Sequence, residues 1–183
     1  MYKVTGVEDT PNPDALKFVL DRPFLESGVK QFDSAREASK DPLAESLFAL
    51  GGVESVFYMG SFVTVSKLPY RSWEDLRPAV IQTVEEKAGA VAPVAPVRTG
   101  GASPSAEDDA LLKKIHMVLE ENVVPALAAD GGGLEVLDFN NYILTIHYQG
   151  ACGSCPSSTS GTMAAVQNLL QRMIDPRIQV IPG

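Results

Sequence analysis

The sequence predicts an α+β protein made of two small domains joined by a flexible linker rich in Ala, Pro and Gly. The linker is indicated by the run AGAVAPVAPVRTGGASPSA at residues 88–106, which has neither a helical nor a strand period. On both sides of this run, short segments with alternating apolar residues are interleaved with segments whose apolar spacing is helical. We therefore expect an N-terminal domain at residues 1–88, a linker at 89–104 and a C-terminal domain at 105–183.

The N-terminal domain is predicted to follow the order β-β-α-β-β-α. A first strand covers residues 3–8, and the residues TPNP at positions 10–13 form a turn. Leu16, Phe18 and Leu20 alternate along the next strand, so they share one face of the sheet. This pair of strands opens the domain.

The first helix of this domain begins at the pair Asp41-Pro42, where Asp caps the helix and Pro takes the first helical position. Its inner face carries Leu43, Leu47 and Leu50, and Gly51-Gly52 ends it. Residues 53–58 and 62–66 then predict a hairpin. Ser72 and Asp75 fit a capping box for a last helix, whose inner residues are Trp73, Leu76, Val80 and Val84.

The C-terminal domain is predicted to follow the order α-β-β-α-β. A capping box, Ser105 to Asp108, starts a helix that Pro125 bends or ends. The glycine run at residues 131–133 is a turn into the first strand, since it lacks the Lys and Ser or Thr of a phosphate-binding loop.

The second half of the C-terminal domain begins with a hairpin. Asn140-Asn141 is the expected turn, and residues 142–149 alternate, with Tyr142, Leu144, Ile146 and Tyr148 on one face. A loop at residues 150–160 leads into a helix, and a last strand covers residues 177–181. The inner side of this helix is predicted to carry Met163, Val166, Leu170 and Met173.

Cys152 and Cys155 are the only two cysteines, and they lie between a predicted strand and a predicted helix. Pro156 fits the first helical position, so Cys155 is placed next to free backbone N–H groups at the positive end of the helix dipole. This position favours the thiolate, which is the form that binds metal. Gly150 and Gly153 leave room for a bulky cluster. Hydroxyl donors follow from Ser154, Ser157, Ser158 and Thr159.

A single CxxC pair is compatible with several kinds of site. The same spacing occurs in half of a zinc site and in a dithiol that exchanges with disulfides. An iron–sulfur cluster takes four thiolates and one chain provides two, so Cys152 and Cys155 of two chains would have to meet at a twofold axis. The spacing alone leaves these alternatives open.

Longer motifs give the sequence a resemblance to a known family. The run QGACGSCPSS at residues 149–158, with the Asp130-Gly131-Gly132 turn and Pro125, resembles the C-terminal domain of NifU-like (Nfu-type) iron–sulfur cluster scaffold and carrier proteins. The N-terminal domain resembles that of the same family through residues 10–13 (TPNP), 62–65 (FVTV) and Trp73, among others. Nearly the whole chain is covered except the linker.

The resemblance implies a scaffold or carrier that binds a 4Fe–4S cluster and passes it to apo-proteins. Its ligands and metal-binding residues here would be Cys152 and Cys155 of two subunits in a homodimer, and a 2Fe–2S cluster is possible. Implied partners are apo iron–sulfur proteins and upstream assembly proteins. The chain departs from the family pattern at Val124, where Arg is common, and at Gly133, where Asp or Asn is common.

No set of catalytic residues can be assembled from the remaining side chains, so we expect no enzymatic turnover. His147 and His116 are predicted to be solvated rather than ligands. The competing functions are a dithiol–disulfide oxidoreductase, which would use the same cysteines, and a zinc-binding adaptor. The N-terminal domain is expected to recognise partners.

Charge and hydropathy restrict the remaining partners. The net charge is −8, and residues 106–183 contain four Lys and Arg against nine Asp and Glu, so we expect no nucleic-acid binding. No segment approaches the ~20 apolar residues that cross a bilayer, so no membrane partner is expected. The first residues, MYKVTGV, do not resemble a targeting leader, and we therefore expect a cytoplasmic protein.

Overall fold

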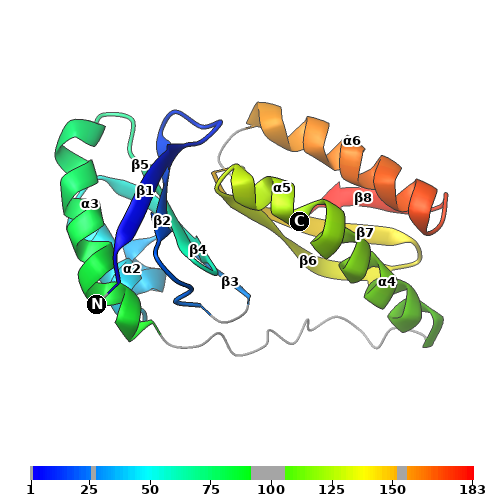
Figure 1. The fold of residues 1–183 in the computed structure, drawn as a ribbon. Helices are drawn as coiled ribbons and strands as arrows, with labels where there is room; N and C mark the ends of the chain where they lie inside the picture. Colours follow the sequence, from blue (N-terminus) through cyan, green and yellow to red (C-terminus); the bar gives the residue numbers. More distant parts are fainter. Residues whose placement is uncertain (1, 26–27, 92–105, 152–155) are drawn as a thin grey trace. The chain divides into compact units, whose positions relative to one another are not determined.

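The computed structural model describes residues 2–25, 28–91, 106–151 and 156–183, with the backbone alone at 106–109 and 156–160. The chain divides into two compact units, Met1–Pro96 and Val97–Gly183, called unit 1 and unit 2 below. Each combines helices with a sheet, which confirms the predicted α+β class (Figure 1). Most of the predicted linker lies outside the described residues; its beginning belongs to a 3-10 helix, Ala88–Ala90.

Unit 1 contains a five-stranded antiparallel sheet in the order β1-β2-β5-β4-β3. Its strands are β1 (Val4–Asp9), β2 (Ala15–Leu20), β3 (Val29–Phe32), β4 (Val53–Met59) and β5 (Phe62–Lys67). The helices are α1 (Ala35–Ala38), α2 (Pro42–Ala49) and α3 (Trp73–Lys87), and α2 and α3 cover one face of the sheet (Figure 1). The structure adds β3 and α1 to the predicted order, between the first pair of strands and the helix that begins at Pro42.

The core of unit 1 lies between the sheet and these helices. Phe18, Val56, Val63 and Val65 project from the strands and are at most 1% exposed. The predicted inner residues of the helices meet them there, since the core also contains Leu43, Leu47, Leu76, Val80 and Val84. Trp73 packs at the edge of this core, with its ring 6.3 Å from that of Phe18.

The helix caps of unit 1 follow the sequence closely. Asp41 caps α2, and Pro42 is its first residue, as predicted. Ser72 caps α3, but its side chain accepts the N–H of Glu74, one residue earlier than a capping box with Asp75 requires. The cap therefore forms, although with a different partner.

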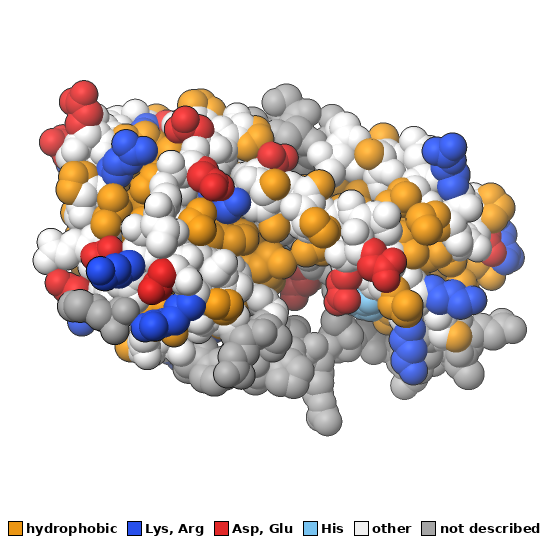
Figure 2. Space-filling model, viewed as in Figure 1, with side chains coloured by type: hydrophobic (Ala, Val, Ile, Leu, Met, Phe, Trp, Pro, Cys, Tyr) orange, Lys and Arg blue, Asp and Glu red, His pale blue; other side chains and the backbone are white. Residues whose placement is uncertain are grey.

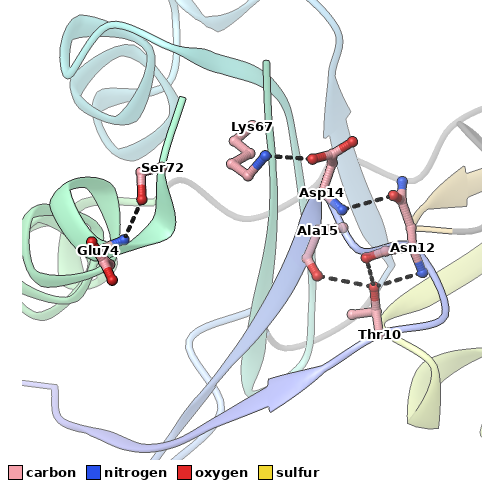
Figure 3. Close-up of polar contacts among 7 residues, drawn as sticks. All are labelled: Thr10, Asn12, Asp14, Ala15, Lys67, Ser72 and Glu74. Atoms are coloured by element: carbon pink, nitrogen blue, oxygen red, sulfur yellow. Dashed lines mark hydrogen bonds and ion pairs between the residues drawn. The ribbon is translucent and has the colours of Figure 1, made fainter. Parts of the chain in front are cut away.

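The turn between β1 and β2 is built from local side-chain contacts (Figure 3). The Asn12 N–H donates to Thr10 Oγ1 (3.2 Å), and the Asp14 N–H donates to Asn12 Oδ1 (3.0 Å). Lys67, at the end of β5, forms an ion pair with Asp14. These contacts explain the residue types at positions 10–13, because short polar side chains that bond to the nearby backbone stabilise tight turns.

Asp41 is also the centre of a buried polar cluster. Its carboxylate accepts hydrogen bonds from the N–H groups of Leu43 and Ala44 (3.2 Å each), from Tyr58 Oη (2.8 Å) and from Lys30 Nζ (2.9 Å). The residue is 3% exposed. The cluster therefore ties the start of α2 to β3 and β4.

This environment shifts two pKa values. Burial raises the pKa of Asp41, but the hydrogen bonds from Lys30, Tyr58 and Ala44 outweigh it, so the pKa lies below its ordinary value of 3.8. Burial raises the pKa of Tyr58, and the neighbouring Asp41 carboxylate raises it further. At neutral pH the carboxylate is charged and the phenol is neutral.

Unit 2 contains a three-stranded sheet in the order β6-β7-β8, in which β7 is antiparallel to β6 and parallel to β8. Its elements are α4 (Ala106–Asn122), α5 (Val124–Ala129), β6 (Gly132–Asn140), β7 (Ile143–Gly150), α6 (Pro156–Met173) and β8 (Gln179–Pro182). The predicted effect of Pro125 is confirmed, because the helix is interrupted at Val123 and Pro125 lies in the first turn of α5. The predicted cap from Ser105 to Asp108 lies outside the described side chains.

The core of unit 2 contains the alternating residues of β7 that were predicted to share a face. Leu144, Ile146 and Tyr148 are buried there against α4 and α6, together with Ile115, Leu119, Val136, Val166 and Leu170. Two expectations were wrong in detail. Met173, predicted to face inward, is the last residue of α6 and is 56% exposed. The hairpin turn is Asn141-Tyr142, both with positive φ, rather than Asn140-Asn141, because Asn140 still belongs to β6.

On the face drawn in Figure 2, positively and negatively charged side chains are interspersed over unit 1. The negative net charge is therefore not gathered in one area of this face. Within the described parts of the chain, no helix has both the length and the apolar character needed to cross a membrane.

Candidate metal centre

The strand β7 ends shortly before the predicted metal ligand Cys152, at a residue with left-handed backbone conformation. Gly150 is the last residue of β7 and has φ of 70°, a conformation that costs side-chain-bearing residues roughly 1–2 kcal/mol. The next residue is held in place, because the Ala151 N–H donates to the Gly131 carbonyl (3.3 Å). The direction in which the chain leaves β7 is therefore fixed by Gly150 and by one bond to a neighbouring turn.

That neighbouring turn joins α5 to β6. Gly131 has φ of 75° and donates its N–H to the Ala128 carbonyl (3.1 Å). Gly132 pairs with Gly150 across the two strands. The glycine run is thus a turn, as predicted. Its Gly131 carbonyl accepts the hydrogen bond from Ala151, the residue before Cys152.

The helix α6 follows the CxxC segment in the sequence. It begins at Pro156, as predicted, and Val166 and Leu170 anchor it in the core. The backbone N–H groups at its N-terminus carry a partial positive charge, which favours thiolates and other anions nearby. Gly150 and Ala151 at the end of β7 and Pro156 at the start of α6 are therefore the described residues on either side of the CxxC pair.

Both predicted ligands, Cys152 and Cys155, belong to these four residues and lie outside the described part of the chain, so their assignment stays a prediction. Among the described residues, no three His, Cys, Asp or Glu side chains gather in a way that could hold a metal ion. A pair of soft thiolates suits iron, zinc or copper(I) rather than magnesium or calcium.

The two histidines take up the positions that the sequence predicted. His147 lies on β7, and its side chain is on the opposite face from Leu144 and Ile146. Its Nδ1 is 3.3 Å from the Gly183 carbonyl oxygen. His116 is exposed on α4. Neither lies in a group of metal-binding side chains within the described residues.

One polar pair near the CxxC segment was not singled out from the sequence. Gln149 Nε2 donates to Glu135 Oε2 (2.8 Å), which links the end of β7 to β6. Gln149 is only 6% exposed, which is rare for an uncharged amide side chain. The period-2 alternation places Gln149 on the face away from the core, and it contains no signal that this residue is buried.

Replacing Gly150 with Ala is expected to lower the thermal stability of unit 2, by roughly 1–2 kcal/mol, because the left-handed conformation is unfavourable for Ala. Gly161→Ala is the matched control. This glycine is inside α6 with no atom within 4 Å of the added Cβ, so the change should be neutral or stabilising. Thermal unfolding followed by circular dichroism would measure both, and equal melting temperatures for the two variants would contradict the expectation.

Two family models match the chain and together cover most of it. The model described as "Scaffold protein Nfu/NifU N terminal" matches residues 4–89, and the model described as "NifU-like domain" matches residues 115–181. The two matches fall in unit 1 and unit 2 respectively.

Two relatives of known name agree with these models. A mitochondrial iron–sulfur cluster scaffold homologue of Homo sapiens is 34% identical over 93% of this chain, which spans 68% of that protein. A mitochondrial NifU-like protein of Arabidopsis thaliana is 32% identical over 91% of this chain, which spans 61% of it. A solution structure of a NifU-like protein from Saccharomyces cerevisiae has a TM-score of 0.44 and 23% identity over 52% of this chain and 84% of that one.

The expectation of a cytoplasmic protein is contradicted by this comparison, because the human relative and two Arabidopsis relatives are named as mitochondrial. The physical reason is that the residues of a folded domain do not encode its compartment, which a removable leader determines. The family prediction, in contrast, is confirmed by both family models and by the relatives. The chain belongs to the Nfu/NifU family of iron–sulfur cluster scaffold proteins.

Proposed function

We propose that this protein is a scaffold or carrier that binds a 4Fe–4S cluster and passes it to apo iron–sulfur proteins. Cys152 and Cys155 of two chains supply the four thiolates, so the cluster is held in a homodimer. The observation that carries this proposal is the CxxC segment between Gly150 and Pro156, in a chain whose family consists of iron–sulfur scaffolds. The human relative is itself named as an iron–sulfur cluster scaffold homologue.

The supporting geometry is the fixed support on both sides of this segment. A left-handed Gly150 and the bond from Ala151 to Gly131 set one end, and the start of α6 sets the other. The helix terminus stabilises thiolate over thiol, so Cys155 binds iron at neutral pH with less competition from protons. In the sequence, Cys152 and Cys155 lie between these two elements, and we infer that they supply two sulfurs to a site shared with a second chain.

Transfer by such a protein is a ligand exchange without a change of oxidation state. An Fe–S bond to Cys152 or Cys155 breaks as a bond to an acceptor thiolate forms. The proton released by the acceptor thiol passes to the departing cysteine. A cluster shared between two chains loses half of its ligands when the chains separate, which makes release easier than from a site built in one chain.

We also propose that unit 1 selects the acceptor, since it has a core of its own and belongs to a different family model from unit 2. The test is cluster transfer from the anaerobically loaded chain to the apo form of a 4Fe–4S hydro-lyase such as aconitase. The full chain should restore the acceptor's activity. A shortened chain, residues 105–183, should bind the cluster but transfer it more slowly to those acceptors that unit 1 recognises.

Two outcomes would contradict the proposal. If the loaded full chain restores activity no faster than free iron and sulfide, it is not a carrier. If instead a colourless monomer reduces a disulfide substrate, the cysteines act as a redox dithiol. Equal transfer rates for the full and shortened chains with every acceptor would remove the role proposed for unit 1.

A further inference from the structure

The loop between β5 and α3, residues 68–72, is held in place by its own backbone and by the turn after α2. The Leu68 N–H donates to the Gly52 carbonyl (2.8 Å), and the Arg71 N–H donates to the Leu68 carbonyl (3.0 Å). At the end of the loop, the Ser72 hydroxyl caps α3 (Figure 3). This segment, called the 68–72 loop below, therefore has a fixed backbone.

Tyr70 projects from this loop, and its side chain is 79% exposed. No other large hydrophobic side chain among the described residues has so high an exposed fraction. A single exposed aromatic residue is common on protein surfaces, so Tyr70 alone indicates nothing. On a fixed backbone, however, such a side chain loses little conformational freedom when it contacts a partner.

The side chain of the next residue, Arg71, is held over Gly52. A Cβ atom at position 52 would overlap with Cγ, Cδ and Nε of Arg71, so the stem of this arginine fills the space that a side chain there would need. Gly52 also has a φ of 101°, a conformation that favours glycine. The guanidinium is therefore anchored through its stem.

This guanidinium has no anionic partner among the described residues. None of the ion pairs in that part of the chain includes Arg71, although Glu74 and Asp75 lie close by in the first turn of α3. Its Nε–H is buried without an acceptor, whereas Nη1 and Nη2 are not among the buried atoms. The two terminal nitrogens therefore remain accessible to an acceptor from another molecule.

The position of Arg71 does not help unit 1 to fold. A buried N–H without an acceptor costs free energy, and no ion pair or side-chain hydrogen bond within the described residues offsets it. Residues that lower stability where they stand are commonly retained for function. An anchored guanidinium with two accessible nitrogens is suited to bind a carboxylate through two parallel hydrogen bonds.

We propose that the 68–72 loop is a docking site for the acceptor protein, where Arg71 binds a surface carboxylate of that protein and Tyr70 packs beside it. This inference rests on the proposed role of unit 1 in selecting the acceptor. Arg and Tyr are among the residue types that dominate binding energy at protein interfaces. A carboxylate matches the single charge of Arg71, whereas a polyanion would be repelled by Glu74, Asp75 and the net charge of −8.

The test is the binding of the metal-free full chain to apo-aconitase, measured by isothermal titration calorimetry at low and high salt. Arg71→Met keeps an apolar stem over Gly52 and removes the charge, and we expect it to weaken binding about tenfold. Tyr70→Ser should weaken binding by a similar factor. The dissociation constant of the wild type should rise with salt, and that of Arg71→Met should rise less.

Arg36→Met is the matched control. Arg36 is exposed on α1 and forms no ion pair with any residue that the structure describes, so this variant removes the same charge from unit 1. It should bind like the wild type. Urea unfolding separates docking from a structural role, because Arg71→Met should be at least as stable as the wild type once the unsatisfied Nε–H is gone.

The outcomes separate this inference from the proposed function. Unchanged binding by Arg71→Met and Tyr70→Ser would overturn the inference, and so would an equal loss for Arg36→Met. If the wild type does not bind apo-aconitase, the role of unit 1 and this inference both fail, while cluster loading at Cys152 and Cys155 still tests the carrier function. Should Arg71→Met fail to fold, Tyr70→Ser decides, since its exposed ring can be removed without loss of packing.

Discussion

Replacing either Cys152 or Cys155 with Ser is expected to abolish cluster binding. In a homodimer each substitution removes two of the four thiolates at once. A Ser hydroxyl stays protonated at neutral pH and is a harder ligand than a thiolate, so it does not replace sulfur on iron. The iron content after anaerobic loading should fall from about four per two chains to nearly none.

Iron and sulfide analysis, together with the visible absorbance of the loaded protein, measures this loss. Met173→Ser is a suitable control, because it removes another sulfur from unit 2 at a side chain that is 56% exposed. The control should load like the wild type. A Cys152→Ser or Cys155→Ser variant that keeps the full iron content would show that the sulfurs of the CxxC pair are not the ligands.

Asp41→Ala is expected to destabilise unit 1 by about 2–4 kcal/mol. The substitution removes the cap of α2, the ion pair with Lys30 and the acceptor of the Tyr58 hydroxyl. Loss of a helix cap costs about 1 kcal/mol, and a buried hydroxyl left without its acceptor costs about 1–3 kcal/mol more. The loss is comparable to a large part of the stability of a small domain.

Urea unfolding followed by Trp73 fluorescence measures this effect in unit 1 specifically, since Trp73 is the only tryptophan of the chain. Asp33→Ala is the control, because Asp33 is exposed and accepts hydrogen bonds only from Gln31 among the side chains described. That control should stay within about 0.5 kcal/mol of the wild type. Equal losses for the two variants would contradict the importance of the buried cluster.

The same cluster gives unit 1 a pH dependence. The pKa of Asp41 in the folded protein is below 3.8, so the stability that its charge supplies is present above about pH 4 and is lost as the pH falls through the folded pKa. Tyr58 affects stability on the alkaline side, because its pKa in the folded protein is raised. The stability from its neutral hydroxyl is present below about pH 10 and is lost as the pH rises through the folded pKa. Asp41→Asn should flatten the acid side of the profile.

Much of the fold could be predicted because local patterns and tertiary packing agree. The alternation along β7 places Leu144 and Ile146 in the core, and the pair Asp41-Pro42 starts a helix where predicted. The missed strand β3, VKQF, is at the edge of its sheet, and all four residues are partly exposed. The sequence of this strand shows no alternation of apolar and polar residues, so no period indicated it. The missed α1 has only four residues, too few for a helical period.

The candidate site was predictable only in part. The CxxC spacing and Pro156 are visible in the sequence, and so is the glycine turn that supports them. The contact between Gln149 and Glu135 is not visible there, because it depends on the register of β6 against β7, including the bulge between Val136 and Asp138. Register is set by the turn and by the core of the whole unit, which no short pattern encodes.

The shared cluster is tested most directly by native mass spectrometry of the anaerobically loaded full chain. The proposal predicts a species of two chains that carries about four irons and four sulfides, and monomers without metal when the cluster is removed. A single chain that carries the complete cluster, or a dimer in which both Cys152 and Cys155 can be alkylated while the cluster remains bound, would contradict it.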